Sequence, residues 1–125
     1  MPTTRADEAL RRCRVVWVQV GERAPRAVWQ VWHDGAVHVV TGPGEQELPG
    51  ADDGSTASVT VPGATALAGR AAQLRCRVEL LHPASAEWEA VVPLLAARRL
   101  NGADPGDLPA RWAAEAAVLR LVPVS

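Results

Sequence analysis

The sequence contains no lysine, isoleucine, phenylalanine or tyrosine, whereas alanine, valine, arginine and glycine are abundant. This bias is typical of a GC-rich genome and carries no functional information. All 13 basic residues are arginines, and 14 acidic residues bring the formal net charge to −1. Nucleic-acid binders usually carry a basic stripe with interleaved aromatic residues, and here only Arg11, Arg12 and Arg14 cluster. We therefore expect no nucleic-acid partner.

Long hydrophobic runs and cysteines are also scarce. The apolar runs fall far short of the roughly 18 residues that a membrane-spanning helix needs, and the N-terminus lacks the apolar core of a signal peptide. Cys13 and Cys76 do not form a close-spaced metal-binding pattern. We expect a cytoplasmic protein with no membrane contact, no metal site and two free thiols. Its 125 residues fit a single domain over 1–125 that can bury its own core.

The clearest structural signal is the segment 26–50. Two β-rich runs flank Asp34-Gly35, a pair that tolerates the positive φ angles of a type I′ turn, so the segment predicts a β-hairpin. Thr41-Gly42-Pro43-Gly44 then ends the second strand. The loop that follows is where a ligand would most naturally sit.

Other strands are predicted on both sides of the hairpin. Residues 14–20 are β-branched and aromatic, and residues 55–61 form a strand that Pro62-Gly63 should stop. Residues 71–81 alternate, which places Leu74, Cys76, Val78 and Leu80 inward. The last strand is expected at 118–124.

Helices are expected at both ends of the chain. Residues 1–12 could form a short N-terminal helix, and 85–115 has helical character. Ser85 begins a helix whose buried stripe is Trp88, Val91, Val92 and Leu95. Pro93 should kink or split it, Asn101-Gly102 should stop it, and a second helix should begin near 107–109.

This order predicts an α+β fold: a small antiparallel split β-barrel of about six strands, with two C-terminal helices before the last strand. A barrel removes the exposed edges that so many short strands would leave. The strands at 14–20 and 28–40 are apolar on both faces, more than one small core can cover, so we expect a homodimer.

The hairpin also carries a resemblance. The run from Arg26 through Asp34-Gly35 to Thr41-Gly42-Pro43-Gly44, with two further strands after it, resembles the pyridoxamine 5'-phosphate oxidase-like split barrels. Members of this family bind FMN, or the deazaflavin coenzyme F420 used by actinobacteria, at a homodimer interface. The resemblance covers about residues 12–82 and implies a flavin- or deazaflavin-binding oxidoreductase acting on an unknown small molecule.

The resemblance also implies a cofactor site. Its residues are Arg26 at the start of a strand, Trp29 for stacking on the ring, and Thr41, Gly42 and Gly44 in the loop. Where the family tends to have basic residues after the third strand, this chain has Glu45-Gln46-Glu47. Two carboxylates there would repel a phosphate by an amount on the order of 1 kcal/mol.

Each of these residues also has a purely structural interpretation. Trp17, Trp29 and Trp32 could stack on a flavin ring, but aromatic residues on strands are more often core or dimer contacts. His33 and His38 have no carboxylate or cysteine at ligand spacing, and no catalytic side chain can be named. The alternative function is therefore a split-barrel dimer without cofactor, acting as a binding or structural module.

Overall fold

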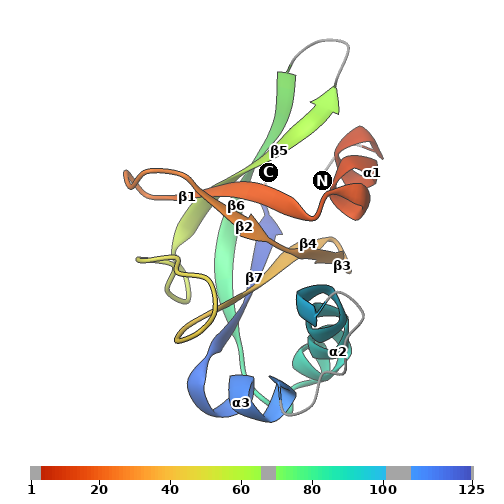
Figure 1. Ribbon diagram of the computed structural model, residues 1–125. Helices are drawn as coiled ribbons and strands as arrows, with labels where there is room; N and C mark the ends of the chain where they lie inside the picture. Colours follow the sequence, from red (N-terminus) through yellow and green to blue (C-terminus); the bar gives the residue numbers. More distant parts are fainter. Residues whose placement is uncertain (1–3, 66–69, 101–107, 125) are drawn as a thin grey trace.

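The computed structural model describes residues 4–65, 70–100 and 108–124 (Figure 1). The elements in chain order are α1 (Thr4–Arg12), β1 (Val15–Val20), β2 (Arg26–Trp29), β3 (Val31–His33), β4 (Ala36–Thr41), β5 (Thr56–Thr65), β6 (Arg70–Leu81), α2 (Ala86–Leu100), α3 (Leu108–Glu115) and β7 (Ala117–Pro123). In the part that is described, no helix has the length and apolar character needed to cross a membrane.

The strands form one antiparallel sheet that rolls up into a barrel. Its order is β2-β1-β5-β6-β7-β4-β3, so β2 and β3 lie at opposite edges. Only Gln30 separates these two strands along the chain, and the two edges of the sheet must therefore meet at this residue. The predicted α+β split barrel is confirmed. It has seven strands rather than about six because the expected second strand is divided at Gln30.

Gln30 is fully buried at this closure point. Its backbone N–H donates to the Arg14 carbonyl, and its side-chain Nε2 donates to the carbonyls of Leu10 and Cys13, at 3.1 and 2.6 Å. A polar side chain is tolerated in this position because it satisfies carbonyls that the sheet cannot reach. Gln30 thereby fastens the end of α1 to the split in the barrel.

The predicted hairpin is confirmed. His33 pairs with Ala36, and Asp34 and Gly35 both have positive φ angles, of 50° and 74°. Two consecutive residues in this region are the requirement of a type I′ turn. The predicted strands at 14–20, 71–81 and 118–124 are also present, within one or two residues of the expected bounds.

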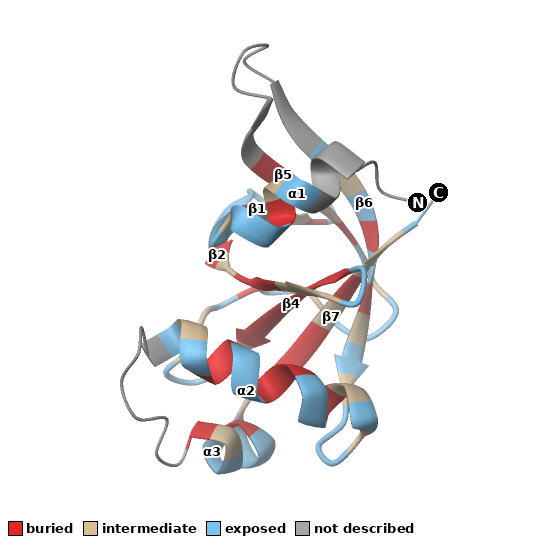
Figure 2. Ribbon diagram, turned by 90° about the vertical axis from the view of Figure 1, so that its right-hand side faces the viewer, coloured by how far each residue is buried: buried red, intermediate tan, exposed pale blue. Residues whose placement is uncertain are grey.

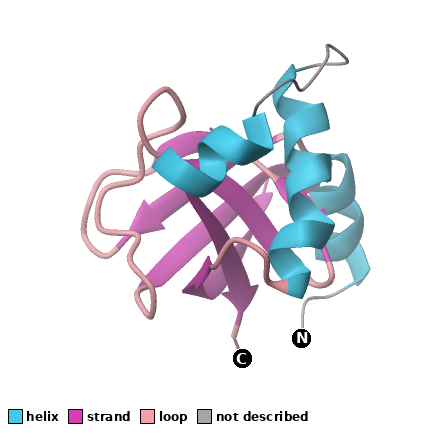
Figure 3. Ribbon diagram, turned by 90° about the horizontal axis from the view of Figure 1, so that it is seen from below, coloured by secondary structure: helices cyan, strands magenta, loops and turns pink. Residues whose placement is uncertain are grey.

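Two hydrophobic clusters lie on opposite faces of the sheet. The first fills the barrel with small aliphatic side chains from β1, β4, β5 and β6, and Leu10 of α1 packs into it. The second lies between the outside of β3, β4 and β7 and the helices α2 and α3. Figure 2 shows buried residues on the strands and along α2, and Figure 3 shows the helices gathered along one side of the sheet.

The helix α2 follows its sequence pattern closely. Trp88 N–H donates to the Ser85 hydroxyl at 3.2 Å, which is an N-cap bond. The buried stripe is the expected one, Trp88, Val91, Val92 and Leu95. Pro93 does not split the helix: it lies inside one continuous segment, on the exposed side.

Some local expectations are wrong. Pro62-Gly63 does not stop β5, which continues to Thr65 with a register shift after Val61. Leu80 is exposed rather than buried, although its cross-strand partner Leu119 belongs to the cluster inside the barrel. The expected stop at Asn101-Gly102 lies outside the described residues.

The apolar excess of segment 28–40 is covered within the chain. Val31 and Val40 belong to the cluster beneath α2 and α3. By contrast, Val15 and Trp17 of β1 are 43% and 45% exposed, on the outward face of the barrel. Of the two segments that are apolar on both faces, 14–20 and 28–40, only β1 in the first therefore leaves large apolar side chains exposed.

Candidate functional site

The loop after β4 forms a shallow pocket. It has a volume of about 520 Å³ and is lined by residues 41–49. The loop folds back on itself, since the Gly42 N–H donates to the Gln46 carbonyl and the Glu45 N–H donates to the Gly42 carbonyl, at 3.1 and 2.9 Å. These bonds give a preformed concave segment at the end of a rigid strand.

Gln46 ties this loop to β2. Its Oε1 accepts a hydrogen bond from the Trp29 N–H at 2.6 Å, and its Nε2 donates to the Trp29 carbonyl at 3.1 Å and to the Val40 carbonyl at 3.4 Å. The side-chain amide therefore links the main chains of β2 and β4 by hydrogen bonds, at the point where the two edges of the sheet do not pair with each other. This bridge holds the loop against the main chain of Trp29.

Glu45 lines the pocket, but its carboxylate is turned into the protein. Its side chain is 1% exposed and accepts hydrogen bonds from Arg99 Nε at 3.1 Å and Arg111 Nη2 at 2.6 Å. Arg99 lies near the end of α2, and Arg111 lies on α3. The expectation that Glu45 would repel a bound phosphate needs correction, because two guanidinium groups compensate its charge.

Glu47 is the exposed carboxylate of the loop. Its side chain is 80% exposed and lies 3.8 Å from the Nη1 of Arg26, which is itself half exposed. At this distance and exposure the pair is weak, on the order of 0 to 1 kcal/mol. Arg26 is therefore near the loop and is held only loosely.

The loop glycines have distinct structural reasons. A Cβ on Gly42 would lie 3.1 Å from the Cα of Ala116, so this residue lets the loop approach the start of β7. Gly44 has a φ of 76° with open space around it. Thr41 ends β4 and pairs with Ala117, whereas Trp29 is half-buried and packs against the second cluster. Trp29, Thr41 and Gly42, which the resemblance assigns to the cofactor site, therefore also have roles in the fold.

The surroundings of the loop carry a small positive excess. In the ion pairs of the loop, Arg26, Arg99 and Arg111 face two carboxylates, those of Glu45 and Glu47, so these pairs carry one more positive than negative charge. Each arginine has five N–H donors, so Arg99 and Arg111 keep donors beyond those given to Glu45, and their side chains are 36% and 42% exposed. These residues fit the phosphate of a flavin or deazaflavin better than the local sequence indicates.

Sequence reasoning missed Arg99, Arg111 and Gln46. The two arginines lie 54 and 66 residues beyond Glu45, and no local pattern reports a contact over that distance. An unusual Gln between two Glu residues offered some signal, but its main-chain partner on β2 becomes visible only once the sheet is assembled.

A second polar cluster lies beneath α2. His38 is fully buried, its Nε2 is 3.1 Å from Glu87 Oε2, and Arg120 Nη1 is 3.6 Å from Glu87 Oε1. His38 and Arg120 are cross-strand partners on β4 and β7. Burial lowers the pKa of His38 from its ordinary value of 6.5, opposed by the carboxylate of Glu87. With no exposed surface, His38 is a structural histidine.

Comparison with solved structures supports the fold. No family model and no curated protein matches the sequence. The structure is similar to the heme storage protein HutZ of Vibrio cholerae, with a TM-score of 0.67 and 12% identity over 94% of this chain and 87% of the other. It is similar to an F420 reductase, with a TM-score of 0.61 and 13% identity over 100% of this chain and 97% of the other. A Listeria innocua protein named for pyridoxamine 5'-phosphate oxidase gives 0.60 and 16%, over 94% and 90%.

The chain has the split-barrel fold of these proteins. The architecture that the resemblance implied is therefore confirmed. The similar structures include one named for pyridoxamine 5'-phosphate oxidase. At such low identities the likeness establishes the fold alone, and the same fold is found in a heme storage protein and in an F420 reductase. The ligand must be argued from the site.

Proposed function

We propose that this chain binds a phosphate-bearing flavin or deazaflavin, FMN or coenzyme F420, at the loop 41–49 and acts as an oxidoreductase on a small molecule. The observation that carries the proposal is the pairing of Glu45 with Arg99 and Arg111. It compensates the charge of Glu45, the main electrostatic obstacle in the loop, and holds two guanidinium groups against the loop. Guanidinium groups suit the doubly charged phosphate of FMN.

The residues divide the work in this proposal. Arg26, Arg99 and Arg111 supply positive charge, and the loop of Thr41, Gly42 and Gly44 supplies backbone amides. Gln46 keeps the loop against β2. A bound flavin or deazaflavin supplies the electron transfer itself, so no catalytic side chain is required of the protein.

The test is reconstitution of the purified chain. FMN and F420 are titrated separately into wild-type protein and Arg26→Ala, and binding is followed by flavin fluorescence or deazaflavin absorbance. We expect saturable binding of one cofactor and a loss of up to about fivefold in affinity for Arg26→Ala, since a partly exposed charge contributes at most about 1 kcal/mol. Arg11→Ala on α1, which also removes one exposed arginine, is the control and should bind as wild type.

The alternative is a split-barrel module without cofactor. It is favoured by Arg26 facing Glu47 and by the engagement of Gln46 with the Trp29 main chain. Failure of both cofactors to bind at micromolar concentration, with the protein folded, would support this alternative and refute the cofactor proposal.

We also propose that the chain forms a homodimer. The exposed Val15 and Trp17 on β1 support this, because they lie together on the outward face of the barrel. Light scattering at micromolar concentration should give about twice the 13.3 kDa of the chain. A mass equal to that of one chain would refute the dimer.

A further inference from the structure

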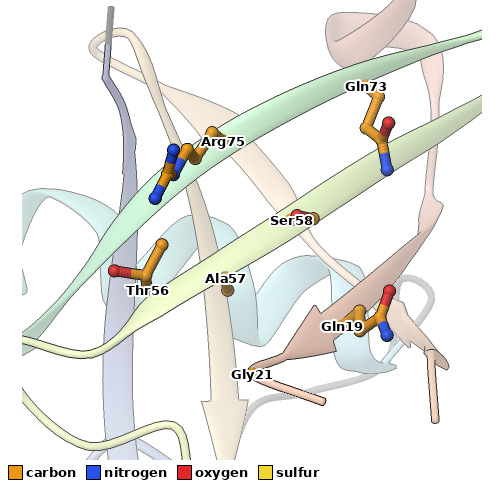
Figure 4. A pocket seen from close by; sticks show the side chains of 7 residues that line it. All are labelled: Gln19, Gly21, Thr56, Ala57, Ser58, Gln73 and Arg75. Atoms are coloured by element: carbon orange, nitrogen blue, oxygen red, sulfur yellow. The ribbon is translucent and has the colours of Figure 1, made fainter. Parts of the chain in front are cut away.

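A second groove lies on the outward face of β1, β5 and β6. It has a volume of about 550 Å³ and shares no lining residue with the loop pocket. Figure 4 shows its lining side chains on three neighbouring strands. The residues are Gln19, Gly21, Thr56, Ala57, Ser58, Gln73 and Arg75.

The strand register aligns three of these residues in one row. Gln19 on β1 is the cross-strand partner of Ser58 on β5, and Ser58 is the partner of Arg75 on β6. Side chains of directly opposite residues have Cβ atoms about 5 Å apart on the same face. An amide, a hydroxyl and a guanidinium group therefore lie side by side.

Two further polar groups flank the row. Thr56 precedes Ser58 by two residues on β5, and Gln73 precedes Arg75 by two residues on β6, so both project to the same face. Of the intervening residues, Ala57 belongs to the cluster inside the barrel and Leu74 packs against it. The sheet thus presents hydrogen-bonding side chains outward over a packed aliphatic core.

Arg75 is the charge of this groove. Among the described residues no carboxylate lies within ion-pair distance of its guanidinium group, whereas Arg77, two residues along the same strand, bonds to Glu79 at 2.7 Å. No acidic residue lines the groove in the described part of the chain. Within the described residues, the guanidinium group of Arg75 is therefore open to a ligand.

We propose that this groove binds a small polar molecule through one oxyanion, a carboxylate or a phosphate group, held by Arg75. A planar guanidinium group matches two oxygens of such an anion. The hydroxyls of Thr56 and Ser58 can donate to the same anion, and the amides of Gln19 and Gln73 can bind polar groups on the rest of the molecule. The volume falls in the usual range for a small-molecule site.

The experiment uses the whole chain and two defined probes. Sodium succinate and inorganic phosphate are titrated separately into ¹⁵N-labelled wild-type protein at constant ionic strength, with sodium chloride as the reference salt. We expect saturable shifts of the backbone amides of residues 56–58 and 73–75. The probe that saturates at the lower concentration identifies the anion as carboxylate or phosphate.

Two matched variants separate a site from general charge attraction. Arg75→Gln should weaken binding by on the order of tenfold, because it removes a charge-assisted hydrogen bond. Arg77→Gln removes the same charge from the same exposed strand and should leave the affinity within about twofold of wild type. The spectra themselves show that each variant is folded.

Absence of saturable shifts with both probes, or equal losses in Arg75→Gln and Arg77→Gln, would overturn the proposal. It is independent of the cofactor proposal, because Arg75→Gln should not change FMN or F420 binding at the loop. Parallel titrations of these cofactors into Arg75→Gln therefore show which of the two sites, if either, is wrong.

Discussion

Arg111 Nη2 donates a 2.6 Å hydrogen bond to Glu45 Oε2 and so joins α3 to the loop after β4. Arg99 of α2 bonds to the other oxygen of the same carboxylate. Since α2 and α3 cover the outer face of the sheet, this single side chain fastens the candidate site to the helical layer. The loop is thereby held from two sides, by Glu45 to the helices and by Gln46 to β2.

Glu45→Gln should destabilise the protein. The change leaves two arginines without their carboxylate and puts a neutral amide in a site that is 1% exposed. Because the arginines are partly exposed, water compensates part of the loss, and we expect a decrease of about 1 to 2 kcal/mol in the free energy of unfolding. Urea denaturation at neutral pH measures it.

Glu47→Gln is the matched control, since Glu47 is 80% exposed and its pair with Arg26 is long. Its free energy of unfolding should stay within about 0.5 kcal/mol of wild type. Equal losses for the two variants would show that the pairing of Glu45 with the helices contributes nothing specific.

Glu47→Lys should strengthen binding of FMN or F420. The change releases Arg26 and replaces a repulsive charge by an attractive one, each worth on the order of 1 kcal/mol or less at an exposed position. We expect a gain of about threefold to tenfold in affinity, measured by titration at low salt and reduced at high salt. Glu45 should stay unchanged in this test, because reversing its charge would place three cations together.

Unchanged affinity in Glu47→Lys would place the phosphate away from this loop. The single variant Glu89→Lys, an equal charge change on the exposed face of α2, controls for overall net charge. A gain of the same size in that variant would show long-range attraction rather than a local site.

The structural features that depend on neighbouring residues could be predicted from the sequence. The Asp34-Gly35 turn, the alternating strand β6 and the stripe of α2 are present because turn geometry and periodicity act over a few residues. The division at Gln30 was missed, since Gln30 bonds to carbonyls 20 and 17 residues earlier, those of Leu10 on α1 and of Cys13 just after it. The role of Glu45 was misjudged for the same reason: its partners come from helices 54 and 66 residues away.

Acid should destabilise the chain through His38. Burial lowers its pKa below 6.5 in the folded state, so the unfolded chain binds more protons as the pH falls. Stability is therefore fully present above pH 6.5 and decreases below it. Around the ring, Glu87 opposes this shift, His33 adds to it, and Arg120 and Glu79 complete the charged groups nearby.

His38→Gln should flatten this pH dependence. Urea unfolding at several pH values between 5 and 8 should show a smaller loss towards acid pH than in wild type, even if the variant is less stable at neutral pH. His82→Gln, a change at an exposed position after β6, should keep the wild-type slope. A His38→Gln slope equal to that of wild type would assign the acid sensitivity to another group.

Deletion of residues 118–125 should give insoluble protein. In the sheet, β7 is not a terminal addition but lies between β6 and β4, pairing with both. Its loss would leave two unpaired strand edges and remove Val118, Leu119 and Leu121 from the two clusters.

Deletion of residues 124–125 alone spares β7 and is the control, expected to remain soluble. The measurement is the soluble fraction after expression and the melting temperature of any soluble product. Because Val118 packs with Trp112 in the outer cluster while Leu121 packs inside the barrel, the full deletion breaks both layers at once. A truncated chain that stayed soluble with an unchanged melting temperature would contradict the central position of β7.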